Sequence, residues 1–105
     1  MTLDDLFETV KQRAANNPEE SWTAKLMTKG PEKCAEKFGE EAVEAIIEAA
    51  KGNKTGLIKE SADVIFHLFV LLRSHDITLS EVLDELTSRQ VQSGLVEKAA
   101  RSLKK

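Results

Sequence analysis

Two pairs of acidic residues have a spacing that can form a binding site. Glu41 and Glu44 are three residues apart, and Glu60 and Asp63 are also three apart. Because residues three apart share one face of a helix, each pair can direct two carboxylates at one point. Carboxylate oxygens are ligands that Mg²⁺ prefers, and a cation held there can polarise a phosphoryl oxygen and orient a leaving group. The pattern therefore indicates a divalent-cation site suited to hydrolysis of a phosphoanhydride.

Helices are predicted to carry these residues, because apolar side chains recur at helical spacing along most of the chain. The predicted helices cover about residues 3–15, 31–50, 55–74 and 78–89. Thr2 is expected to cap the first helix, Pro31 to begin the second, and the run from Thr78 to Glu81 to form a capping box. The segment from Ser21 to Lys29 is either a short helix or an irregular arm.

The fold class predicted is all-α, an antiparallel helical bundle with no β-sheet. We expect a single domain over residues 1–105, with its core at about 3–89 and a C-terminal tail at 90–105. A domain of this size leaves much of its surface exposed, so completion of the bundle by dimerisation is also predicted.

The turn at residues 51–54 sets the relative height of the two acidic pairs. A short connection makes the flanking helices antiparallel neighbours. With Gly52 as the fold-back point, Glu44 and Glu60 lie eight residues to either side. Glu41 and Asp63 lie eleven residues to either side of the same point. Four carboxylates at matched levels repel one another unless a cation lies between them, although rotation about each helix axis is left open.

A solvated acidic face is the alternative interpretation, and for the helix over 31–50 alone it is the favoured one. The helix over 55–74 changes the balance, because apolar residues surround it and such helices are normally buried in a core or an interface. A buried Asp63 needs a partner, since an unpaired buried carboxylate is costly. A metal shared between the helices is the simplest partner. His67 lies on the same stripe and is interpreted as a core residue more readily than as a ligand.

Positive and aromatic side chains precede the acidic segment. Lysines recur every four residues, at Lys25, Lys29, Lys33 and Lys37. They form either a solvated cationic face or a set of phosphate-binding residues beside the metal. Trp22 either stacks on a nucleotide base or belongs to the core. Gly39, inside a predicted helix, indicates either a close approach by substrate or a second helix, or simple tolerance.

Composition limits the class of protein. The net charge of −3 argues against a general nucleic-acid binder, which usually has a basic surface. The single cysteine, Cys34, favours a reducing compartment. The longest apolar run, Val64 to Leu72, is too short to span a membrane. We therefore expect a cytoplasmic protein with no nucleic-acid and no membrane partner.

The acidic motif and its flanking segments resemble a known family. The segments 37–44 and 60–63 look like the EExxE…ExxD signature of the MazG-like all-α NTP pyrophosphatases. The segments 21–26, 29–33 and 93–101 resemble, more narrowly, the phosphoribosyl-ATP pyrophosphatase family. The resemblance covers about residues 3–101 and matches the stand-alone form of that enzyme.

The resemblance implies an enzyme of histidine biosynthesis that hydrolyses 1-(5-phosphoribosyl)-ATP to 1-(5-phosphoribosyl)-AMP and pyrophosphate. It implies Mg²⁺ as cofactor, with Mn²⁺ as a substitute, and a homodimer or higher homo-oligomer. Glu41 and Glu44 are the expected catalytic residues. The expected metal ligands are Glu41, Glu44, Glu60 and Asp63, with Glu40 as a further ligand or a supporting group. Two alternatives stay open: a house-cleaning (d)NTP pyrophosphatase, and a non-catalytic helical dimerisation module.

Overall fold

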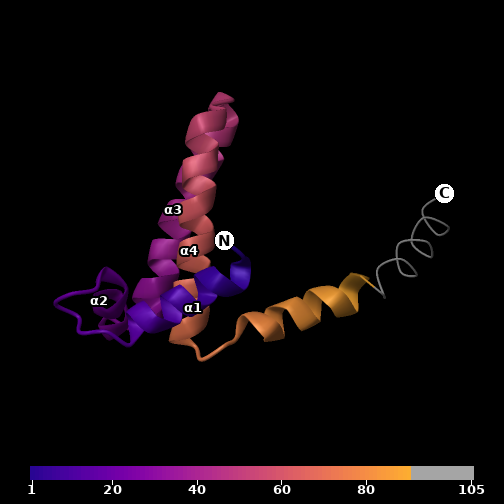
Figure 1. Cartoon of the computed structure of the whole chain (residues 1–105). Coiled ribbons are helices and arrows are strands. Elements are labelled where there is room, and N and C mark those ends of the chain that lie inside the picture. The colour runs from indigo at the N-terminus through magenta and orange to yellow at the C-terminus, as the bar shows by residue number, and fades with distance from the viewer. Residues whose placement is uncertain (91–105) are drawn as a thin grey trace.

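The chain is built from helices, as the sequence predicts. The structure is a computed structural model that describes residues 1–90, and no strand occurs within that range. The helices are α1 (Leu3–Ala14), α2 (Trp22–Thr28), α3 (Pro31–Lys51) and α4 (Lys54–Ser74), followed by a helix over residues 79–90. α3 and α4 form a long hairpin, and α1 and α2 lie against its lower part (Figure 1). The predicted all-α class is confirmed.

Local chemistry explains the sharp turn of the hairpin. α3 ends at Lys51, and Gly52 follows in the left-handed region with φ +70°, where a residue without Cβ is favoured. The Asn53 side chain then accepts a hydrogen bond from the backbone N–H of Gly56 and caps α4. Since only two residues separate the helices, α3 and α4 must run antiparallel side by side, and theirs is the most extensive helix pairing.

The N-terminal helices begin at side-chain caps. Thr2 and Asp5 form a capping box for α1, in which each side chain accepts a hydrogen bond from the other's backbone N–H. The Ser21 hydroxyl accepts from the Ala24 N–H and donates to the Arg13 carbonyl, so it both caps α2 and ties α2 to the end of α1. Residues 22–28 are therefore helical, which decides between the two interpretations of that segment.

The core lies at one end of the hairpin, where the shorter helices meet it. Its buried apolar residues come from every helix: Val10, Leu26, Cys34, Phe69, Val70 and Leu79. Phe7 of α1 packs edge-on against Phe69 of α4, with ring centroids 5.3 Å apart. The turn end of the hairpin has no such cover, because α1 and α2 do not reach it (Figure 1).

The apolar residues of α4 predict that the helix is buried on every side. Within the single chain Ile58 is 71% exposed and Ile65 is 40% exposed. The core therefore buries only part of α4, and burial of the rest in an interface stays a prediction. Asp63 is exposed in the single chain, so the expectation that it is buried is wrong. α3 also carries exposed apolar side chains, at Val43, Ile46 and Ile47.

The C-terminal part of the described chain begins as predicted. Thr78 and Glu81 form the expected capping box, in which the Glu81 N–H donates to the Thr78 hydroxyl and the Glu81 carboxylate accepts from the Thr78 N–H. The predicted loop and short helix of the tail, and the segment 93–101 that carries part of the resemblance, lie outside the described residues. Across residues 1–90, no helix has both the length and the apolar character needed to cross a membrane.

Candidate active site

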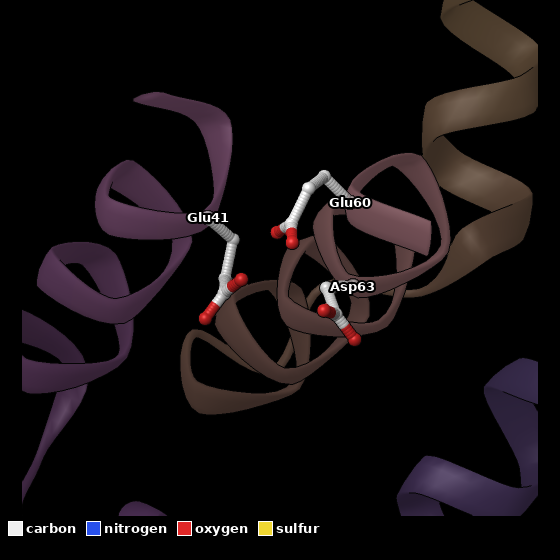
Figure 2. Close-up of side chains that lie close together, drawn as sticks. All are labelled: Glu41, Glu60 and Asp63. Atoms are coloured by element: carbon white, nitrogen blue, oxygen red, sulfur yellow. The ribbon is translucent and has the colours of Figure 1, made fainter. Parts of the chain in front are cut away.

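Three of the predicted acidic residues meet between α3 and α4. Glu41 extends from α3 toward Glu60 and Asp63, which come from α4 (Figure 2). One carboxylate oxygen of each residue lies within 4.8 Å of the corresponding oxygen of the other two. Residue counting around Gly52 placed these side chains at similar levels, and the structure supplies the missing rotation about the two helix axes. We call Glu41, Glu60 and Asp63 the acidic cluster.

Glu44 lies beside this cluster without belonging to it. Of all the groups that shift the pKa of Glu60, its counterpart at the same distance from Gly52, Glu44 acts most strongly. A hydrogen bond with Glu44 is the largest cause that raises the pKa of Glu60 to about 7, followed by burial and by the charges of Glu44, Asp63 and Glu41. Two carboxyl groups can share a hydrogen bond only if one of them keeps a proton. Without a cation, Glu60 is therefore only partly ionised at neutral pH.

The cluster fits a divalent cation with oxygen ligands. The Oε2 atom of Glu60 is buried and has no hydrogen-bond partner among the described residues. Buried polar atoms are normally paired, so an unpaired oxygen on a carboxylate of this cluster indicates a missing positive partner. The donors are all carboxylate oxygens, which suit hard cations. A cation bound here would offset the repulsion among the carboxylates and favour the ionised form of Glu60.

Glu40 occupies a different environment from the cluster. Its carboxylate lies 3.3 Å from the Lys37 ammonium group, and its side chain is 51% exposed. The same ammonium group lies 3.6 Å from a Glu41 oxygen. These two neighbours raise the pKa of Lys37, with the hydrogen bond to Glu40 as the largest cause. Lys37 thus links Glu40 to the cluster residue Glu41. Glu40 fits the role of a supporting group better than that of a metal ligand.

His67 is buried beside the same helix interface. Its side chain is 7% exposed, and its Nδ1 atom has no hydrogen-bond partner in the described part of the chain. Burial is the largest cause that lowers the pKa of His67, while the charge of Glu41 opposes the shift. The imidazole is therefore neutral at pH 7. The burial of His67 agrees with its interpretation as a core residue. A core histidine normally has hydrogen-bond partners for its ring nitrogens, however, and Nδ1 has none among the described residues.

The four predicted phosphate-binding lysines do not form one continuous face. Lys25 lies in α2 and Lys29 follows it as the C-cap, whereas Lys33 and Lys37 lie in α3 beyond Gly30. Lys33 pairs with Glu36 at 3.2 Å, and Lys37 pairs as described above. Within residues 1–90, Lys25 and Lys29 form no ion pair. These two side chains therefore keep their charge available for another anion.

Two recesses adjoin α4 near its middle. The first, of about 530 Å³, is mostly apolar and includes Asp63 and Phe66 together with the start of α1. The second, of about 320 Å³, lies where the end of α1 meets the start of α2 and includes Trp22. Trp22 is 52% exposed, so the interpretation that places it in the core is wrong. Arg13 of α1 and Asn16 of the following connection, which also line the second recess, were not predicted, since nothing in their local sequence distinguishes them.

The fold and this cluster define a class of protein: all-helical chains with a group of carboxylates between two antiparallel helices. The family model described as phosphoribosyl-ATP pyrophosphohydrolase matches residues 3–90. Phosphoribosyl-ATP pyrophosphatase of Ruegeria pomeroyi is 59% identical over 99 residues, which cover 94% of this chain and 94% of that protein. The enzyme of the same name from Paracoccus denitrificans is 60% identical over 99 residues, covering 94% of this chain and 92% of that protein.

A third relative, phosphoribosyl-ATP pyrophosphatase of Roseobacter denitrificans, is 58% identical over 101 residues, covering 96% of each chain. The chain therefore belongs to the phosphoribosyl-ATP pyrophosphohydrolase family. Membership confirms the prediction of a hydrolase that cleaves a pyrophosphate bond. It also decides against the alternative of a non-catalytic dimerisation module.

Proposed function

We propose that this chain hydrolyses 1-(5-phosphoribosyl)-ATP to 1-(5-phosphoribosyl)-AMP and pyrophosphate, a step of histidine biosynthesis, with Mg²⁺ held by Glu41, Glu60 and Asp63. The observation that carries the proposal is the meeting of three carboxylate oxygens within 4.8 Å of one another. Family membership supplies the substrate. When bound, the cation polarises a phosphoryl oxygen and offsets the charge of the departing pyrophosphate.

The proton of the attacking water needs an acceptor, and Glu44 is the proposed one. It lies next to Glu60 but outside the group of three, so its oxygens remain free for the proton when the cation holds the cluster. A general base must lie within hydrogen-bonding reach of the water that it activates. Glu41 combines two roles in this scheme, since it contributes an oxygen to the cluster and is held by Lys37.

Positive side chains hold the phosphate groups of the substrate in this proposal. Lys25 and Lys29 are exposed and form no ion pair within residues 1–90. Lys33 and Lys37 are already paired with glutamates on α3, so their contribution is smaller. Preorganised positive groups near the leaving pyrophosphate stabilise the charge that develops in the transition state.

A second copy of the chain is the proposed cover for the exposed apolar residues of the hairpin. Ile46 is 66% exposed and Ile58 is 71% exposed. A further recess of about 630 Å³ along α4 is lined mainly by Leu57, Ile58, Ala62 and Ile65. A two-fold dimer buries the same patch on both copies, which suits a self-complementary apolar face.

We also propose a cytoplasmic location, where Cys34 stays a free thiol.

The decisive experiment measures pyrophosphate release from phosphoribosyl-ATP with Mg²⁺, with Mn²⁺ and with a chelator. We expect release with either metal and none with the chelator. Glu41→Gln should lower kcat at least a hundredfold, because it removes a ligand oxygen. Glu36→Gln is the matched control, since Glu36 is on the same helix, is exposed and pairs with Lys33.

A panel of dNTPs tests the substrate. Phosphoribosyl-ATP should give the highest kcat/KM in the panel. If dUTP or another dNTP is the far better substrate, the house-cleaning alternative replaces the present proposal. If the chelator leaves the rate unchanged, the metal assignment fails.

A further inference from the structure

The recess between α1 and α2 has no role in the chemistry at the acidic cluster. It has a volume of about 320 Å³ and is shaped by the end of α1, the beginning of α2 and one residue of α4. The residues that line it are Arg13, Asn16, Glu20, Ser21, Trp22, Thr23 and Phe66. Aromatic surface and polar edge groups thus occur together in a space large enough for a heterocycle.

Trp22 provides a flat aromatic surface in this recess. Its side chain is about half exposed, although aromatic groups of this size are usually buried. The Lys29 ammonium group lies 5.9 Å from the centroid of the indole ring, which places a cation against the ring. A planar base can stack on exposed indole, because every base has an apolar face.

Hydrogen-bonding groups surround the aromatic surface. Asn16 offers both donors and an acceptor, and Arg13 offers donors only. Within residues 1–90, neither side chain takes part in a protein hydrogen bond or ion pair. Glu20 adds a carboxylate to the same recess. That negative charge disfavours a phosphate group here and favours a base with an exocyclic N–H donor.

Phe66 connects this recess with the acidic cluster. It lines both this recess and the larger one that includes Asp63. Phe66 follows Asp63 by three residues on α4, which is roughly 4.5 Å along the helix axis. Because Phe66 lines both, the recess that includes Trp22 adjoins the recess that includes Asp63.

We propose that this recess binds the purine base of the nucleotide substrate, with Trp22 stacking on the base and with Asn16 and Arg13 as specificity-determining residues at its edge. The inference rests on the proposed function, because it assigns the part of the substrate that the acidic cluster does not hold. It predicts that recognition of the base is independent of the metal.

Fluorescence offers a direct test, because Trp22 is the only tryptophan and the chain has no tyrosine. AMP is titrated into the full-length protein in a chelator, and the indole emission is recorded. We expect saturable quenching by AMP and none by ribose 5-phosphate, which has no base. Equal quenching by ribose 5-phosphate, or no quenching by AMP, would overturn the inference.

Variants test the edge residues. Asn16→Ala should raise the Kd for AMP roughly tenfold, as loss of hydrogen bonds to a base predicts. In the hydrolysis assay it should raise KM for phosphoribosyl-ATP and leave kcat nearly unchanged. Gln12→Ala is the matched control, because Gln12 is exposed in the last turn of α1, four residues before Asn16, and does not line the recess. Equal Kd values for the Asn16 variant and the wild type would contradict the assignment.

The two proposals fail in distinguishable ways. If wild-type protein releases pyrophosphate in a metal-dependent reaction but AMP does not quench Trp22, only the base-binding inference is lost. If AMP quenches Trp22 but no pyrophosphate is released, the proposed hydrolysis is lost and nucleotide binding stands. Glu41→Gln should lower kcat as stated above and leave the quenching intact.

Discussion

Glu60 is the residue on which the electrostatics of the acidic cluster depend most. Its hydrogen bond with Glu44, its burial and the neighbouring charges raise the pKa of Glu60 to about 7 from its usual value of 4.5. Between those two pH values the folded protein binds more protons than the unfolded chain. The raised pKa of Glu60 therefore stabilises the folded protein. This stabilisation is complete below pH 4.5 and is lost as the pH rises through 7.

Glu60→Gln should therefore flatten the pH dependence of stability in the metal-free protein. Glutamine resembles the protonated acid, so the variant does not lose stability when Glu60 would ionise. We expect the melting temperature of the wild type, measured in a chelator, to fall more between about pH 5 and about pH 8 than that of the variant. His67 has the opposite sign, because its pKa is lowered, but it is present in both proteins and cancels in the comparison. Parallel curves would contradict the assigned shift.

Metal binding should reverse that instability. A ligand that binds only the folded state stabilises it by about 2.7 kcal/mol at a hundred times its Kd. We expect millimolar Mg²⁺ or Mn²⁺ to raise the melting temperature by several degrees at pH 8, and Glu44→Gln to remove part of that increase. Asp63→Asn should remove most of it. An unchanged wild-type melting temperature would argue against a cation at the cluster.

At the scale of the helices, the turn between α3 and α4 decides whether the carboxylates meet. Gly52 ends α3 with a positive φ, and Asn53 begins α4 as its cap. Gly39 differs, because it lies inside α3 in ordinary helical conformation. A Cβ at Gly39 would meet no atom within 4 Å in the described structure, so no neighbour within the chain requires glycine there.

Gly52→Ala and Gly39→Ala should change stability in opposite directions. At Gly52 a Cβ is strained by the left-handed backbone, so we expect a loss of about 1–2 kcal/mol. At Gly39 alanine is the better helix former, so we expect a gain of up to about 1 kcal/mol. Urea denaturation of both variants measures these free energies. If Gly39→Ala keeps its stability but loses activity, substrate or a second copy approaches α3 closely at that residue.

At the scale of the whole molecule, the core and the site occupy different parts of the hairpin. The core lies where α1 and α2 pack against one end of it, and Leu79 at the start of the helix over 79–90 adds to it. The upper part exposes large apolar residues on both helices. Contiguous apolar surface of this kind is typical of an interface between protein chains.

Ile58→Asp should separate a dimer into monomers. At the centre of a two-fold apolar interface, the introduced carboxylates of the two copies would lie close together. They would repel each other and lose their hydration. We expect sedimentation velocity to show a dimer or larger species for the wild type and mainly monomer for the variant. Lys59→Asp at an exposed position next in sequence is the charge control. A wild type that sediments as a monomer would refute the proposed second copy.

The sequence by itself determined the helices and the levels of the acidic residues. Caps act through neighbouring residues, so Thr2, Gly52 and the Thr78–Glu81 box could be recognised from residue type and spacing. A turn of two residues fixes the register of an antiparallel hairpin, which is why counting from Gly52 paired Glu44 with Glu60. The resemblance to the family also rested on local segments, and its match over residues 3–90 confirms it.

Only the tertiary structure decided which side chains meet. Counting residues leaves free the rotation of each helix about its axis, and that rotation brings Glu41, Glu60 and Asp63 together while Glu44 lies to one side. Burial of Trp22 depended on how far α2 docks against the hairpin, which no local pattern encodes. The recess lined by Arg13, Asn16, Trp22 and Phe66 joins the segment over 13–23 to α4, because packing between helices, rather than spacing within one, brings these residues around one space.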